Sequence, residues 1–194
     1  MPDKIRKYME TADRFSRAEM YQTVPGYDGQ ASRDLTERWA AYDICPSALI
    51  DKHIVDVGCN VGGFSAYCAP HCASYLGIDA FDDSIRMARE LYKFPNCRFE
   101  NMRFRDLVGT WDVMLALAVR RYTELTYEQF AERAASLLTG GGMMYFESHT
   151  RERWGPRPKK AFERFFRIGR VLEVPGTSKK ECKHTRFFVE LEKR

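Results

Sequence analysis

The stretch His53-Ile-Val-Asp-Val-Gly-Cys-Asn-Val-Gly-Gly-Phe64 decides the fold of this 194-residue chain. An apolar strand pattern at 54–58 runs directly into a glycine-rich turn, and a helix is predicted from residue 62. Glycine lets the backbone adopt positive φ and approach a ligand closely, which a side chain would prevent. We expect Gly58 and Gly62 to need this freedom, and Asp56, near the strand end, to accept a hydrogen bond from a cationic amine.

Beyond this stretch, short apolar runs alternate with amphipathic segments, a pattern typical of βα units around a parallel sheet. Strands are predicted at 54–58, 75–79, 97–101, 111–117 and 142–147, and helices at 62–69, 82–93 and 126–138. Two β-rich runs, 168–174 and 185–191, flank a turn region and predict a terminal antiparallel pair. The predicted fold is therefore α/β, with a Rossmann-like, seven-stranded, mainly parallel sheet that ends in an antiparallel hairpin.

The region before this sheet has a different pattern. Residues 3–20 predict a charged helix, 21–34 a loop and 35–42 a second, short helix. We expect residues 1–50 to form a helical N-terminal cover and residues 51–194 to form the α/β domain.

Composition excludes several classes of protein. The first residues contain no apolar run that could act as a signal peptide or membrane span, which predicts a soluble, cytoplasmic protein without membrane contact. Six scattered cysteines contain no CxxC pair, and the group Cys68, His71 and Cys72 lacks a second ligand pair, so we predict no metal site. Residues 1–150 carry 17 Lys and Arg against 21 Asp and Glu, whereas residues 151–186 carry 12 against 4. A basic C-terminal segment thus follows a mildly acidic body.

A second acidic residue, Asp79, supports the interpretation of the glycine turn as part of a ligand-binding site. Asp79 ends the next predicted strand, 21 residues after Gly58, where a carboxylate can bind both hydroxyls of a ribose. A helix N-cap is the alternative role for Asp79. A dinucleotide oxidoreductase more often has three glycines spaced as GxGxxG, whereas this chain has Gly58, Gly62 and Gly63.

These motifs resemble those of class I methyltransferases over most of the chain, from about residue 21 to 191. DVGCNVGGFS resembles the glycine-rich first motif of that family, and GID its ribose-binding acid. WDVMLALAV is similar to the fourth strand, and LLTGGGMMYFESH to the fifth strand preceded by a glycine turn. The resemblance makes residues 51–194 a methyltransferase domain and implies S-adenosylmethionine as the cofactor.

The resemblance also implies roles for individual residues. The methionine moiety of the cofactor is expected beside Asp56, Gly58, Asn60 and Gly62, and the ribose on Asp79. Asn101 and Met102 resemble the positions that flank adenine, and residues 116–119 are expected to line the floor near the sulfonium. The expected cofactor-binding set also includes Cys59, Ala80, Ala116 and Leu117, together with three polar residues of the N-terminal cover that would reach the cofactor carboxylate, Gln30, Arg33 and Arg38.

The substrate side of the site is expected at the carboxyl edge of the sheet, where open α/β folds bind ligands. Arg120, Arg121 and Tyr122 follow the fourth strand and would contact the acceptor, although a solvated helix start also explains the two arginines. His149, after the fifth strand, is the candidate general base by its pKa and place. A histidine that only bonds loop backbone is the alternative.

The basic residues after the fifth strand predict an anionic acceptor. Arg151 and Trp154 complete the expected substrate-binding set, within a cluster that also contains Arg153, Arg157, Lys159 and Lys160. Such a cluster binds phosphate or carboxylate, although charge runs also commonly face water. We therefore predict methyl transfer to a small phosphorylated or carboxylated molecule. An RNA (tRNA) nucleotide as acceptor and a non-catalytic cofactor-binding protein remain alternatives, and the sequence does not predict an oligomeric state.

Overall fold

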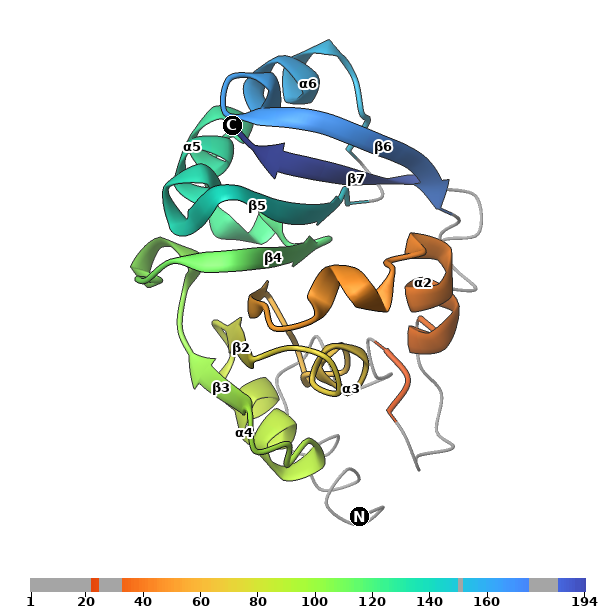
Figure 1. Ribbon diagram of the computed structural model, residues 1–194, viewed down its shortest axis with the longest axis vertical. Coiled ribbons are helices and arrows are strands. Elements are labelled where there is room, and N and C mark those ends of the chain that lie inside the picture. Colours follow the sequence, from red (N-terminus) through yellow and green to blue (C-terminus); the bar gives the residue numbers. More distant parts are fainter. Residues whose placement is uncertain (1–21, 25–32, 150–151, 175–184) are drawn as a thin grey trace.

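The computed structural model describes residues 22–24, 33–149, 152–174 and 185–194. Within these residues, seven strands form one sheet in the order β3-β2-β1-β4-β5-β7-β6 (Figure 1). Strands β1 to β5 are parallel, whereas β7 runs antiparallel to both β5 and β6. The predicted Rossmann-like, mainly parallel sheet with its antiparallel terminal hairpin is confirmed.

The strands are β1 (His53–Val57), β2 (Ser74–Asp79), β3 (Cys97–Asn101), β4 (Trp111–Leu117), β5 (Leu138–Glu147), β6 (Phe166–Val174) and β7 (Arg186–Lys193). The α-helices are α2 (Leu35–Tyr42), α3 (Ser65–Cys68), α4 (Asp82–Leu91), α5 (Tyr127–Leu137) and α6 (Pro156–Glu163). Among the described residues, the short 3-10 helices are η1 (Pro46–Leu49), η2 (Phe104–Asp106) and η3 (Arg120–Thr123).

The fifth strand differs most from its predicted range, because it starts at Leu138 instead of residue 142. The predicted glycine turn before this strand is an irregularity within it. Trp111 pairs with Leu138, but Val113 pairs with Met143, so the register shifts where the three glycines lie. Gly141 has a φ of +72°, a conformation that favours glycine.

Alternating side chains of the strands build a hydrophobic core on each face of the sheet. On one face, Ile54 and Leu115 pack with residues of α2, α3 and α4. On the other face, Val55 and Met114 pack with residues of α5 and α6. In Figure 1, α5 and α6 lie beside β5, β6 and β7, and α4 lies beside β3. This two-sided burial explains the nearly continuous apolar runs of the central strands.

The described part of the N-terminal region packs against the sheet. Helix α2 begins after Asp34, whose carboxylate accepts a hydrogen bond of 2.8 Å from the backbone N–H of Glu37. Leu35 and Tyr42 are buried in the same core as β1 and β4. The helix predicted at 3–20 lies outside the described residues, and the division at residue 50 stays a prediction.

In the part of the chain that the structure describes, no helix has the length and apolar character needed to cross a membrane.

Candidate active site

The glycine-rich turn after β1 is tightly packed against the loop that follows β4. Gly58 and Gly62 have φ values of +71° and +79°. A Cβ atom at Gly58 would lie 2.3 Å from Cγ2 of Val119, a distance that no side chain tolerates. Asn60 also has a positive φ, 52°, which asparagine tolerates better than most residues. The turn therefore requires the backbone freedom predicted from its sequence.

Asp79, at the end of β2, is bound to this turn. Its Oδ2 accepts a hydrogen bond of 2.9 Å from the backbone N–H of Asn60, and its Oδ1 accepts one of 3.0 Å from Phe81. Burial raises the pKa of Asp79, and hydrogen bonds from backbone N–H groups oppose that rise. Helix α4 begins at Asp82 with Phe81 as its N-cap. The alternative role of Asp79 as the N-cap of that helix is therefore wrong.

The residues predicted to flank adenine meet Asp79. The side-chain amide of Asn101 and the backbone N–H of Met102 each donate a 3.0 Å hydrogen bond to the backbone carbonyl of Asp79. Ala80 is exposed beside them. Three further predicted cofactor residues are buried, namely Cys59 in the turn and Ala116 and Leu117 at the end of β4. The structure thus brings the β1, β2, β3 and β4 members of the predicted set to one edge of the sheet.

Asp56 is a buried acid near the end of β1. Its Oδ2 accepts a 2.5 Å hydrogen bond from the hydroxyl of Tyr75 on β2. Burial raises the pKa of Asp56 to about 7, although the Tyr75 hydrogen bond and the charge of Arg38 lower it. The sequence gives no sign of Tyr75 as a partner, because the pairing depends on the register between β1 and β2.

On the substrate side, Tyr122 and His149 come together from η3 and the end of β5. The tyrosine Oη lies 3.3 Å from Nε2 of His149, and the two rings meet edge to face. Tyr122 is 70% exposed, so this pair lies at the surface of the edge. The exposed Arg121 precedes it.

Arg120, the first residue of η3, is held by contacts with the protein at the same edge of the sheet. Its guanidinium group forms an ion pair with Glu152 and donates a 2.9 Å hydrogen bond to the carbonyl of Leu125. Glu152 in turn accepts a 2.9 Å hydrogen bond from the backbone N–H of His149. Glu152, which fixes both the arginine and the backbone of the histidine, is not apparent as a site residue from the sequence.

Two of the N-terminal residues predicted to reach the cofactor carboxylate, Arg33 and Arg38, lie at the end of β5. Arg33 and Arg38 are buried, and both guanidinium groups bind the carboxylate of Glu147. Their contact with the cofactor stays a prediction. Gln30 and Arg151, two further members of the predicted set, lie outside the described residues.

Trp154 lies against the core beneath α6. Its ring stacks on Phe162 with a centroid distance of 5.7 Å and an interplanar angle of 27°. The ring is only partly exposed. The contact of Trp154 with substrate stays a prediction.

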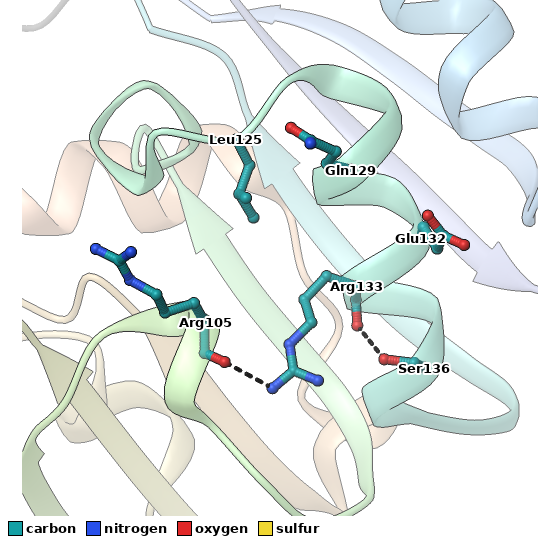
Figure 2. A pocket seen from close by; sticks show the side chains of 6 residues that line it. All are labelled: Arg105, Leu125, Gln129, Glu132, Arg133 and Ser136. Carbon is teal, nitrogen blue, oxygen red and sulfur yellow. Dashed lines mark hydrogen bonds between the residues drawn. The ribbon is translucent and has the colours of Figure 1, made fainter.

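A shallow hollow of about 320 Å³ lies outside this site, between η2 and α5. Figure 2 shows Arg133 in the wall of this hollow, where its guanidinium group donates a hydrogen bond of 3.2 Å to the carbonyl of Arg105. No residue of the predicted site lines this hollow. Among the described residues, no group of three or more His, Cys, Asp or Glu side chains is placed to hold a metal ion.

The glycine turn, the acid after β2 and the strand order define a class I, Rossmann-like methyltransferase fold. Residues 55–144 match the family model described as a methyltransferase domain.

Solved structures give the same fold. The N-methyltransferase NodS from Bradyrhizobium japonicum WM9, in complex with S-adenosyl-L-homocysteine, has a TM-score of 0.69 and 15% sequence identity. The match covers 99% of this chain and 97% of that one. Magnesium protoporphyrin IX methyltransferase from Synechocystis PCC 6803, with the same compound bound, has a TM-score of 0.61 and 17% identity over 82% of this chain and 80% of that one.

A curated relative matches a shorter segment. The O-antigen chain terminator bifunctional methyltransferase/kinase WbdD of Escherichia coli is 36% identical over 81 residues, which is 38% of this chain and 11% of that protein. The chain therefore spans a small part of the length of that relative.

Proposed function

We propose that this chain transfers a methyl group from S-adenosylmethionine to a small anionic molecule bound at the carboxyl ends of β4 and β5. The observation that carries this proposal is the meeting of Tyr122 and His149 at that edge, 3.3 Å apart. The edge adjoins the cofactor side of the site, because Val119, three residues before Tyr122, packs on Gly58.

The residues around the glycine turn fit the cofactor. Gly58 and Gly62 leave backbone where a Cβ atom would collide with neighbouring side chains. The carboxylate of Asp79 would hold the ribose hydroxyls. Asn101 and Met102 would flank the adenine, and Asp56 would lie beside the methionine moiety. S-adenosylmethionine supplies a methyl group on a sulfonium, which is open to in-line displacement. Positioning of the acceptor is then the main task of the protein.

His149 would accept, at Nε2, the proton that the acceptor loses, and Tyr122 would orient the imidazole ring. A base is needed only where the accepting atom carries a proton. The Arg120 and Glu152 ion pair supports this arrangement, because Glu152 binds the backbone N–H of His149.

Basic side chains near this edge favour an anionic acceptor. Arg121 is exposed in η3, and Arg153 is exposed after β5. Arg157, at the start of α6, lies 3.6 Å from Glu128 and is also largely exposed. Guanidinium groups bind carboxylate or phosphate through paired hydrogen bonds. Arg151 and Trp154 complete this proposed acceptor-binding set.

The test is methyl transfer from labelled S-adenosylmethionine to separated cell fractions of small molecules, RNA and protein. Label in an anionic small molecule is the expected result, and a shallow dependence of the acceptor KM on salt should accompany it. Label in RNA with a steep salt dependence would replace the small-molecule acceptor by a nucleic acid. Cofactor binding without transfer to any fraction would favour the non-catalytic alternative.

A further inference from the structure

Glu147, the last residue of β5, is a fully buried carboxylate at the edge of the proposed site. Arg33 binds it with two parallel hydrogen bonds, from Nη1 to Oε2 at 3.1 Å and from Nη2 to Oε1 at 2.7 Å. Both side chains are almost completely buried. Paired bonds of this kind are strong and specific in direction, and therefore fix the backbone around Arg33 relative to β5.

Arg38, on α2, extends this contact toward the glycine turn. Its Nη2 donates a 3.1 Å hydrogen bond to Glu147, and its Nη1 donates one of the same length to Oε1 of Gln22. The guanidinium carbon lies 4.9 Å from the ring centroid of Phe64, which directly follows the turn. One side chain thus connects the end of β5, the N-terminal segment and the turn.

Gln22 itself packs on the turn. A Cβ atom at Gly63 would lie 2.8 Å from Nε2 of Gln22 and equally close to Cδ2 of Leu35. Backbone contacts hold the two parts of this segment together, because the N–H of Thr23 donates to the carbonyl of Arg33 at 2.9 Å. The described residues 22–24 and 33–38 therefore form a wall directly against the glycine turn.

Arg186, at the start of β7, adds a third cation near Glu147. Its Nη1 lies 3.7 Å from Oε2 of Glu147, and its side chain is 1% exposed. Burial alone would raise the pKa of Glu147, but the charges of Arg38, Arg33 and Arg186 lower it to about 2. The carboxylate is therefore ionised at neutral pH and available to all three cations.

We propose that Glu147 is a positioning residue. Through Arg33 and Arg38, it holds residues 22–24 and 33–38 against the glycine turn, and this held wall is required for tight retention of the cofactor. The cofactor part of this inference rests on the proposed function, whereas the placement of the segment does not. A wall that is already in place spares the ordering cost that a loose segment would add to cofactor binding.

The test compares Glu147→Gln with Glu173→Gln, which removes an exposed carboxylate of β6. In Glu147→Gln, we expect faster hydrogen exchange in peptides covering 33–42, with exchange in β1 and β4 unchanged. We also expect S-adenosyl-L-homocysteine to bind about tenfold more weakly, and KM for S-adenosylmethionine to rise while kcat at saturation stays within about twofold. The Glu173 variant should match the wild type.

A second variant covers the case in which Glu147→Gln fails to fold. Arg33→Lys keeps the charge but cannot form two parallel hydrogen bonds, so we expect the same changes at smaller size. Wild-type exchange in 33–42 in a folded variant would overturn the proposal, as would faster exchange with unchanged affinity for S-adenosyl-L-homocysteine. A wild-type protein that binds no S-adenosyl-L-homocysteine would overturn the proposed function, and hydrogen exchange would still decide the placement of the segment.

Discussion

The backbone N–H of Asn60 donates a 2.9 Å hydrogen bond to Oδ2 of Asp79, which joins the glycine turn to the acid at the end of β2. Two motifs that lie 19 residues apart in the sequence are therefore parts of one structure. The carboxylate that would hold the cofactor ribose also fixes the conformation of the turn. Substitutions on either side of this bond should affect cofactor binding.

Replacing Gly58 by alanine should abolish cofactor binding. The added Cβ would meet Val119 at 2.3 Å, and the positive φ of the position adds backbone strain. Calorimetric titration with S-adenosyl-L-homocysteine measures the loss. Gly140→Ala is the matched control, because no atom lies within 4 Å of its Cβ position and its affinity should equal that of the wild type. Undiminished binding by a folded Gly58→Ala protein would place the cofactor elsewhere.

Asp79→Ala should weaken cofactor binding by roughly 1–3 kcal/mol, the usual cost of losing a hydrogen bond to a charged group. The variant also loses the bonds to the N–H groups of Asn60 and Phe81, so thermal unfolding must be recorded with affinity. Asp106→Ala, which removes an exposed carboxylate of η2, serves as the control. Equal affinities of the two variants would count against a ribose contact.

Asp56 should make the stability of the protein depend on pH. Its pKa is raised to about 7 by burial, from 3.8. Below pH 3.8 the carboxyl is protonated in both the folded and the unfolded protein. Between pH 3.8 and about 7, the carboxyl ionises in the unfolded protein but stays protonated in the folded one. The free energy of unfolding therefore falls as pH rises through this window, by roughly 4 kcal/mol.

Asp56→Asn removes this dependence. Thermal or denaturant unfolding should show that the stability of the variant, relative to that of the wild type, increases from pH 4 to pH 8. Asp106→Asn should show no such gain. If the difference in free energy of unfolding between Asp56→Asn and the wild type is the same at pH 4 and pH 8, the carboxyl does not titrate in this range.

His149→Ala should lower kcat by about a hundredfold if the imidazole takes the proton of the acceptor. Affinity for S-adenosyl-L-homocysteine should remain close to the wild-type value, because the imidazole contacts Tyr122 on the substrate side of the site. His71→Ala, at an exposed histidine after α3, should leave both quantities unchanged. A wild-type kcat in His149→Ala would assign the histidine to structure.

The parts of the fold that depend on local sequence were predictable. Strand β1 and its turn are encoded in adjacent residues, and Asp79 ends the very next strand. The start of β5 was misplaced because its glycines indicate a turn locally, whereas pairing with β4 extends the strand across them.

The buried contacts of the site were not predictable, because they join distant positions. Glu147 binds Arg33 across 114 residues and Arg38 across 109, and neither distance leaves a pattern in the sequence. Both arginines were identified as functional candidates, but their protein partner was not. The same limit applies to Tyr75, which reaches Asp56 only when β1 and β2 pair.

Calorimetric titration of the wild-type protein with S-adenosylmethionine, and separately with NAD, tests the central claim most directly. The glycine turn and Asp79 predict saturable binding of S-adenosylmethionine at one site per chain, with S-adenosyl-L-homocysteine competing for it. NAD should give no comparable heat. Tight binding of NAD together with no binding of S-adenosylmethionine would contradict the account.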